Sequence, residues 1–248
     1  MKLVLVILLS AFSVHGGCQQ LQLHYDLRHT VDPKHTKKNF PAFFFEYFRS
    51  PKPDSAYGIV KPGSFLLKAQ SELSGERNNM GQYYVQVSQG FRFWKPKVYV
   101  QFQYNGGLGI AEPGAYGYYL TNAFSVGVAY SFQWRNKAFF NVYSSYKYTA
   151  FKKASHDNIS AFFWLIFFSN YRINFTGNIV TLTENRDHGD AFTMMKLGKK
   201  FSVFSDPQIW LKVYQGLSVG SRVNMYYHLL TEDDRVQAYP SAALRYQF

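Results

Sequence analysis

The chain has 248 residues and a net charge of +12, and aromatic residues make up 19% of it while charged residues make up 17%. It has no uninterrupted apolar run of the roughly 18 residues that a membrane-spanning helix needs, so a helical membrane protein is excluded. Lys and Arg are scattered between aromatic residues instead of clustering on one helix face, so we expect no nucleic-acid partner.

The N-terminal residues have the pattern of a secretory signal peptide. Lys2 precedes an apolar run from Leu3 to Phe12, and small residues follow. We expect residues 1–18 to be removed as a signal and residues 19–248 to form one domain. Cys18 is the only cysteine, so an internal disulfide is excluded. It is either a lipoprotein-type acylation site or a cysteine lost with the signal.

The rest of the chain is a series of segments in which apolar and polar residues alternate, as they do in β-strands with one apolar and one solvent-exposed face. Their lengths suit tilted membrane strands, which need roughly 9–11 residues. We expect about twelve strands, at Leu21–Arg28, Asn39–Arg49, Ser64–Glu72, Gln82–Phe93, Val98–Asn105, Thr121–Gln133, Ala138–Thr149, Asn158–Phe168, Arg172–Thr183, Phe201–Val213, Leu217–Tyr227 and Val236–Phe248.

The connections between these strands alternate between short and long, which is how outer-membrane barrels are wired. The short ones are Trp94–Lys97, Trp134–Lys137, Ser169–Arg172 and Tyr214–Gly216, with a longer one at Ser50–Gly63 on the same side. The long polar ones are His29–Lys38, Leu73–Gly81, Gly106–Leu120, Ala150–Asp157, Glu184–Lys200 and His228–Arg235. A bilayer tolerates no unpaired strand edge, so the strands must close on themselves. The pattern predicts an all-β fold, a transmembrane antiparallel up-and-down β-barrel of about twelve strands.

The last strand carries a further signal. Ala242, Leu244, Tyr246 and Phe248 alternate with polar or small residues, and the sequence stops on the aromatic ring. This ending resembles the closing strand of bacterial outer-membrane barrels, whose terminal Phe is read by the barrel-insertion machinery. The resemblance implies that this strand closes the barrel against Leu21–Arg28. It also implies outer-membrane lipid and the insertion machinery as partners, in a Gram-negative outer membrane.

Five aromatic residues fall at the short-turn ends of the expected strands, and such rings favour the boundary between water and hydrocarbon. We expect them to form a membrane-interface girdle at one rim: Trp94, Trp134, Tyr171, Tyr214 and Phe248.

The polar faces of the strands predict a hydrated lumen that leans positive and favours neutral or anionic solutes over cations. Aromatic rings with the same parity, such as Phe204 and Trp210, suit stacking on a planar base or sugar, or else they only narrow the barrel. The candidates for lining the lumen or binding solute are Asp26, Arg28, Glu46, Arg92, Gln103, Lys147, Phe204, Asp206, Trp210 and Arg222. Tyr143, Phe162 and Trp164 blur the alternation, and the orientation of Asn158–Phe168 stays open.

Six segments in this order carry a resemblance to a known family: Leu21–Asp26 (LQLHYD), Gln103–Gly107 (QYNGG), Ser145–Lys147 (SYK), Asp206–Trp210 (DPQIW), Leu217–Gly220 (LSVG) and the terminal Phe248. Together they resemble an outer-membrane family of Gram-negative bacteria that is similar to the Tsx nucleoside-specific channel family. The resemblance implies a twelve-stranded barrel that passes nucleosides or similar small solutes, and we expect the barrel to be a monomer. Arg222 departs from the pattern, since relatives tend to carry an acidic residue there.

Three other functions fit parts of the pattern. A closed structural or adhesion-type barrel shares nearly all of these features, and a secreted soluble all-β binding protein shares some. An outer-membrane enzyme would need a nucleophile beside a base, and Ser155, His156 and Asp157 are neighbours in sequence that point to opposite faces of a strand. There is no metal-type His/Cys spacing. We therefore expect no catalytic residues, no metal and no cofactor.

Overall fold

The computed structural model describes residues 18–248 except 51–58, 77–78, 112–115, 136, 154–156, 192 and 231–233. The expected signal peptide and the Ser155–His156 pair lie outside the described residues. The elements in chain order are β1 Cys18–Asp26, α2 Arg28–Val31, β2 Phe40–Arg49, β3 Lys61–Glu72, β4 Gln82–Arg92, β5 Val98–Ala111, β6 Tyr116–Trp134, β7 Ala138–Thr149, β8 Asp157–Phe168, β9 Ile173–Asn185, β10 Lys199–Ser205, β11 Gln208–Lys212, β12 Leu217–Tyr227 and β13 Val236–Gln247.

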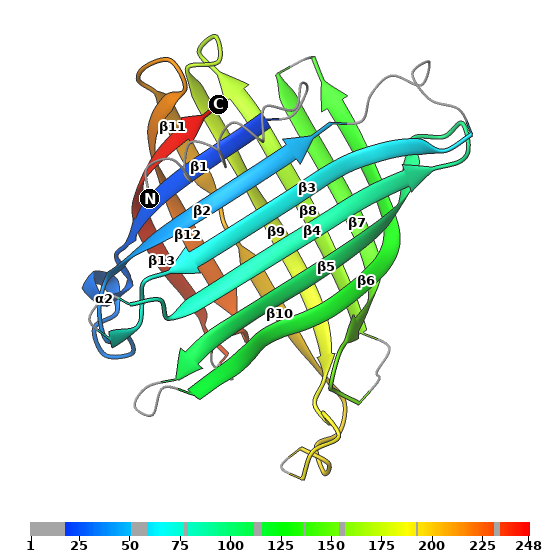
Figure 1. Ribbon diagram of the computed structural model, residues 1–248, viewed down its shortest axis with the longest axis vertical. Helices are drawn as coiled ribbons and strands as arrows, with labels where there is room; N and C mark the ends of the chain where they lie inside the picture. Colours follow the sequence, from blue (N-terminus) through cyan, green and yellow to red (C-terminus); the bar gives the residue numbers. More distant parts are fainter. Residues whose placement is uncertain are drawn as a thin grey trace, which may run out of the picture.

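All strands pair antiparallel with their neighbours, and the sheet closes on itself (Figure 1). The closing pair is β1 with β13, in a register that runs from Gln20 opposite Gln247 to Asp26 opposite Ser241. Because every strand then has two partners, no open edge faces the bilayer, which confirms the predicted closed antiparallel barrel. Among the described residues, no helix is long and apolar enough to cross a membrane.

Two short segments, β10 and β11, together make one barrel strand, which gives twelve strands around the barrel. Both pair with β9 on one side and β12 on the other, in the same register before and after the break. The break falls at Asp206 and Pro207, where proline has no N–H to donate to the ladder. The Pro207 carbonyl still accepts the N–H of Val223 at 3.0 Å, so the strand stays in line.

The two ends of the barrel differ. The terminal rim holds Cys18, Phe248 and the hairpins that follow β4, β6, β8 and β11, and the Phe248 N–H donates to the Gln19 carbonyl at 3.0 Å. The loop rim, at the opposite end, holds the other connections, including the protrusion between β9 and β10 at the bottom of Figure 1. Short turns gather at the terminal rim as predicted. The β2–β3 connection there falls largely in residues 51–58, which are not described.

Two expected loop-rim boundaries were wrong. The segment Gly106–Leu120 is not a long loop, because β5 and β6 stay paired as far as Ala111 opposite Tyr116. Gly106, Gly107 and Gly109 hid the strand signal of the β5 end in the sequence, since they show neither an apolar nor a polar face. Arg28 lies in the short helix α2 instead of in β1.

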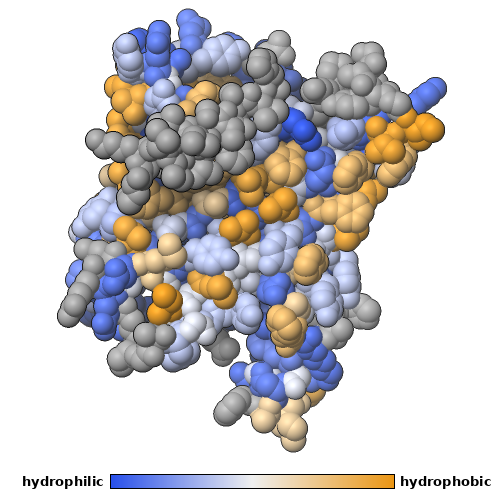
Figure 2. Space-filling view, in the orientation of Figure 1, coloured by the Kyte–Doolittle hydropathy of each residue, from blue (hydrophilic) through white to orange (hydrophobic). Residues whose placement is uncertain are grey.

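Side chains alternate between lumen and exterior as the sequence predicts. On β13, Leu244 and Tyr246 are exposed, and Ala243 and Arg245, which alternate with them, are buried. Figure 2 shows the apolar residues of the visible exterior in orange. An exterior of this kind faces hydrocarbon, which completes the predicted transmembrane barrel.

The β8 strand, whose orientation the sequence left open, is apolar on both faces. Its register with β7 places Ile159 opposite Ser145 and Phe163 opposite Asn141, so the odd-numbered residues of β8 face the lumen. Phe162 and Trp164 face outward, and the Trp164 ring lies against the Phe175 ring, 5.7 Å between centroids. A Cβ on Gly177 would stand 2.7 Å from Trp164 Cζ2 and 2.9 Å from Pro207 Cα, so only glycine leaves room for this indole.

Candidate functional site

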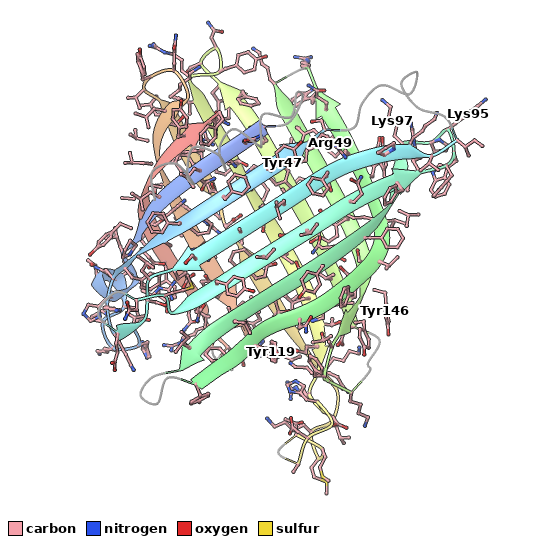
Figure 3. All side chains as sticks on the ribbon, in the orientation of Figure 1. Tyr47, Arg49, Lys95, Lys97, Tyr119 and Tyr146 are labelled. Atoms are coloured by element: carbon pink, nitrogen blue, oxygen red, sulfur yellow. The ribbon has the colours of Figure 1, made fainter. Side chains whose placement is uncertain are left out.

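A cavity of about 1810 Å³ lies in the lumen. Its lining includes Lys97 and Gln247 at the terminal rim and Thr149 and Glu184 toward the loop rim. Lys97 and Lys95 stand at the β4–β5 hairpin (Figure 3). A cavity whose lining extends to both rims is the geometry that passage through a barrel requires.

A buried ion pair occupies the wall where β11 and β12 meet. Arg222 Nη2 lies 3.0 Å from Asp206 Oδ2, and the two side chains are 7% and 5% exposed. Asp206 Oδ1 also accepts the backbone N–H of Asn178 at 2.9 Å. The Arg222 guanidinium lies 4.4 Å from the centroid of the Phe44 ring, three strands away. This network fixes both charges, so neither is available to hold a solute without breaking the pair.

Next to the Asp206–Arg222 ion pair, Trp210 is wholly buried. Its exposed fraction is 0%, its Nε1–H donates to Gln208 at 3.1 Å, and the Arg245 guanidinium covers it at 4.4 Å from the ring centroid. The His24 ring lies edge-on at 5.9 Å. Of the two alternatives for Trp210, this burial favours a ring that fills the wall over one that stacks on a solute, because the ring is not part of the cavity lining.

A ladder of amides lines the wall of β4 and β5. Gln101 donates to Gln103 at 3.3 Å, Gln103 to Asn105 at 3.2 Å, and the Tyr84 hydroxyl donates to the same Asn105 oxygen at 2.8 Å. These residues carry no formal charge but offer hydrogen bonds along the lumen.

Two further ion pairs involve residues of β1, α2, β2 and β3. Lys68 lies 3.3 Å from Glu46, which also accepts from Gln20 at 3.0 Å. Arg28 lies 2.8 Å from Asp26, and its guanidinium stacks 4.5 Å from the centroid of the Phe40 ring.

Ion pairs also gather at the loop rim. Lys152 lies 2.5 Å from Glu184, and Lys153 lies 2.7 Å from Asp187 in the β9–β10 protrusion. The hydrogen bond from Lys153 lowers the pKa of Asp187 below its ordinary value. The Lys153 N–H donates to the His188 carbonyl at 2.9 Å, so the protrusion is tied to the β7–β8 connection beside the cavity mouth.

Apolar residues form a second kind of wall. Phe163, Leu165 and Phe167 of β8 line the cavity. Phe139 of β7 joins them at 6.2 Å from the Phe163 ring and also contacts Phe48 of β2 at 6.0 Å between centroids. Because β2 and β7 are not neighbours in the sheet, the Phe48–Phe139 contact crosses the lumen and narrows it near the terminal rim.

Eight of the ten predicted lumen residues line the cavity: Arg28, Glu46, Arg92, Gln103, Lys147, Phe204, Asp206 and Arg222. Asp26 and Trp210 are on the inner side but buried in the wall. Among the described residues, eight Lys and Arg side chains line the cavity against five Asp and Glu side chains, which agrees with the expected positive lean. The structure does not bring the ten together at one point, since Arg92 lies near the terminal rim and Lys147 near the loop rim.

All five predicted girdle residues are exposed at the terminal rim: Trp94, Trp134, Tyr171, Tyr214 and Phe248. Their position fits an interface girdle, and that role remains a prediction. Among the described residues, no three His, Cys, Asp or Glu side chains gather as metal ligands would.

Sequence reasoning missed Arg245 as a site residue and the apolar lining of β8. The signal for Arg245 was present, because it is the cation of the closing strand on the inward parity. The signal for β8 was absent, since a strand that is apolar on both faces shows no alternation.

Fold and lumen together define an antiparallel transmembrane β-barrel whose interior has both polar and apolar walls. Residues 18–248 match the family described as Domain of unknown function (DUF5020), and the chain belongs to that family. A comparison with curated proteins gives no significant match.

Solved structures show similar folds at low sequence identity. The NanC porin is 10% identical with a TM-score of 0.52, over 93% of this chain and 100% of that one. OccAB3 of Acinetobacter baumannii is 8% identical with a TM-score of 0.41, over 95% and 100%. LpxR from Salmonella typhimurium is 8% identical with a TM-score of 0.42, over 93% and 100%.

Proposed function

We propose that this protein is a monomeric outer-membrane channel through which small polar solutes diffuse. The observation that carries the proposal is the cavity of about 1810 Å³, whose polar lining extends to both rims. The NanC porin, whose fold is similar, is consistent with a channel. The exposed aromatic residues and short turns at the terminal rim support an orientation with that rim on the periplasmic side and the loop rim outward.

We further propose nucleosides as one class of solute. The support is the order of the Tsx-like segments, together with rings that border the cavity beside polar groups. Phe204 and Tyr226 lie 5.3 Å apart between centroids, and Phe44 stands beside Arg222. Aromatic faces next to hydrogen-bonding groups suit a planar base.

Recording of ionic current across planar bilayers tests both the channel and its proposed nucleoside solutes. The folded protein should give discrete conductance steps, and adenosine should reduce the current at lower concentration than ribose does. Phe204→Ala should weaken the adenosine effect and leave the conductance of the solute-free channel present. A folded protein without conductance contradicts the channel, and conductance that adenosine and ribose affect equally contradicts only the nucleoside proposal.

One observation favours a second candidate, a closed structural or adhesion-type barrel. The Phe48–Phe139 contact crosses the lumen, and the Trp210 wall is filled. If that contact seals the lumen, Phe48→Ala should produce conductance that the natural sequence lacks.

A further inference from the structure

Arg245 is a buried cation that forms no ion pair among the described residues, although the Glu46 carboxylate lies close enough to interact with its charge. It is 3% exposed, lines the cavity, and takes part in none of the ion pairs found there. Its Nη1–H donates to Asn174 at 3.3 Å, while Nε and Nη2 are buried and have no hydrogen-bond partner within the described part of the chain, so an anion reaches them only when the side chain moves toward the cavity. Glu46, the lumen carboxylate on β2, is already held by Lys68 and Gln20. A buried guanidinium with unmet donors favours an anion, above all a carboxylate, which accepts two parallel hydrogen bonds.

The surroundings hold this guanidinium in place. Its Cζ lies 4.4 Å from the centroid of the Trp210 ring, and the indole is fixed by its hydrogen bond to Gln208. Stacking of this kind pre-orients the planar fork, so less side-chain entropy is lost when an anion binds. Arg222, the neighbouring cation, differs because Asp206 neutralises it.

An apolar wall adjoins the unmet charge. Asn174, which accepts the Arg245 hydrogen bond, is the direct cross-strand partner of Phe167. Leu165 and Phe163 continue this wall along β8, and all of them line the same cavity. A free ion such as chloride would make no use of such a wall, whereas a solute with an apolar body beside its anionic group would gain by burying that body.

We propose that this region is a binding site for small organic carboxylates with an aromatic or short apolar body. Arg245 holds the carboxylate, and Leu165 and Phe167 cover the body. The inference rests on the proposed channel function and adds organic carboxylates to nucleosides as a second class of solute. It agrees with the excess of cations in the lining.

Three probe molecules separate the two parts of the proposal in planar bilayers. Phenylacetate carries both charge and ring, phenylacetamide has the same shape without the charge, and acetate has the charge without the ring. Phenylacetate should reduce the current at a concentration about tenfold lower than either of the others, since one charge-assisted bidentate contact corresponds to a tenfold effect or more.

Variants locate the site. Arg245→Gln should raise the half-blocking concentration of phenylacetate about tenfold and leave that of phenylacetamide unchanged. Lys97→Gln removes the same charge from the cavity lining at the terminal rim and serves as the matched control, with little effect expected. Phe167→Ser should weaken block by phenylacetate and not by acetate, which keeps the proposal testable if Arg245→Gln fails to fold. Heat-modifiable gel migration checks that each variant is folded.

The outcomes distinguish this inference from the channel itself. Conductance without discrimination among the three probes, or equal effects of Arg245→Gln and Lys97→Gln, overturns the carboxylate site and leaves the channel standing. If the folded barrel gives no current, calorimetric titration with phenylacetate decides. Binding that Arg245→Gln abolishes supports the site without a channel, and absence of binding overturns both.

Discussion

At the scale of single residues, two ion pairs in the lumen differ in their exposure to solvent. Asp206 and Arg222 are 5% and 7% exposed, whereas Glu46 and Lys68 are 22% and 27% exposed. Removing one partner of a buried pair leaves an uncompensated charge, while pairs in contact with water contribute little. The two pairs should therefore respond differently to the same chemical change.

Asp206→Asn should lower the free energy of unfolding by about 3 kcal/mol, because Arg222 loses its counter-charge. Glu46→Gln should cost less than about 1 kcal/mol. Urea unfolding in lipid vesicles measures both. The double variant Asp206→Asn with Arg222→Gln should recover part of the stability that Asp206→Asn loses. Equal losses of stability in Asp206→Asn and Glu46→Gln would contradict the expected difference between the buried and the exposed ion pair.

Gly177 is a second residue whose role follows from packing. A Cβ there would stand 2.7 Å from the Trp164 ring and 2.9 Å from Pro207, so Gly177→Ala should destabilise the barrel by about 1–3 kcal/mol. Gly117→Ala is the matched control, because the nearest atom to its added Cβ is 4.0 Å away. Similar unfolding curves for the two variants would show that the indole can move aside.

At the scale of the strands, the alternation of apolar and polar residues predicted the strand positions and the closure of the barrel. β7 and β12 have the predicted bounds, and β13 closes on β1 as expected. The failures share a physical cause. Parity shows which side a residue faces but not how deep it lies, so Trp210 was placed correctly on the inner side and wrongly at the cavity. Both faces of β8 are apolar, so its orientation emerges only from its register with β7 and β9.

The orientation of β8 is itself testable. A lysine at Phe162 would face hydrocarbon and should cost about 2–4 kcal/mol near the bilayer midplane. A lysine at Phe163 would face the cavity and should cost clearly less. The fraction of heat-modifiable, folded protein in vesicles compares the two variants, and a greater loss for Phe163→Lys would reverse the assigned faces.

At the scale of the whole molecule, closure and lumen follow from different parts of the sequence. Closure requires only twelve strands that each have one apolar face, and the alternation of apolar and polar residues in the sequence shows such strands. Whether the lumen stays open depends on side chains that meet across it, such as Phe48 and Phe139, which come from strands far apart in the sheet. No local pattern predicts such a contact, because it depends on the shape of the closed barrel.

The central claim is that the lumen is an open path between the two rims. Gln103 is buried on the lumen wall and Val100 faces the opposite side of the same strand, so each can be replaced by cysteine in a Cys18→Ser background. Modification of Gln103→Cys by a charged, water-soluble thiol reagent in a planar bilayer should reduce the current when the reagent is added from either side. Val100→Cys should be unaffected. A Gln103→Cys barrel that is folded yet unreactive from one or both sides would contradict the open path.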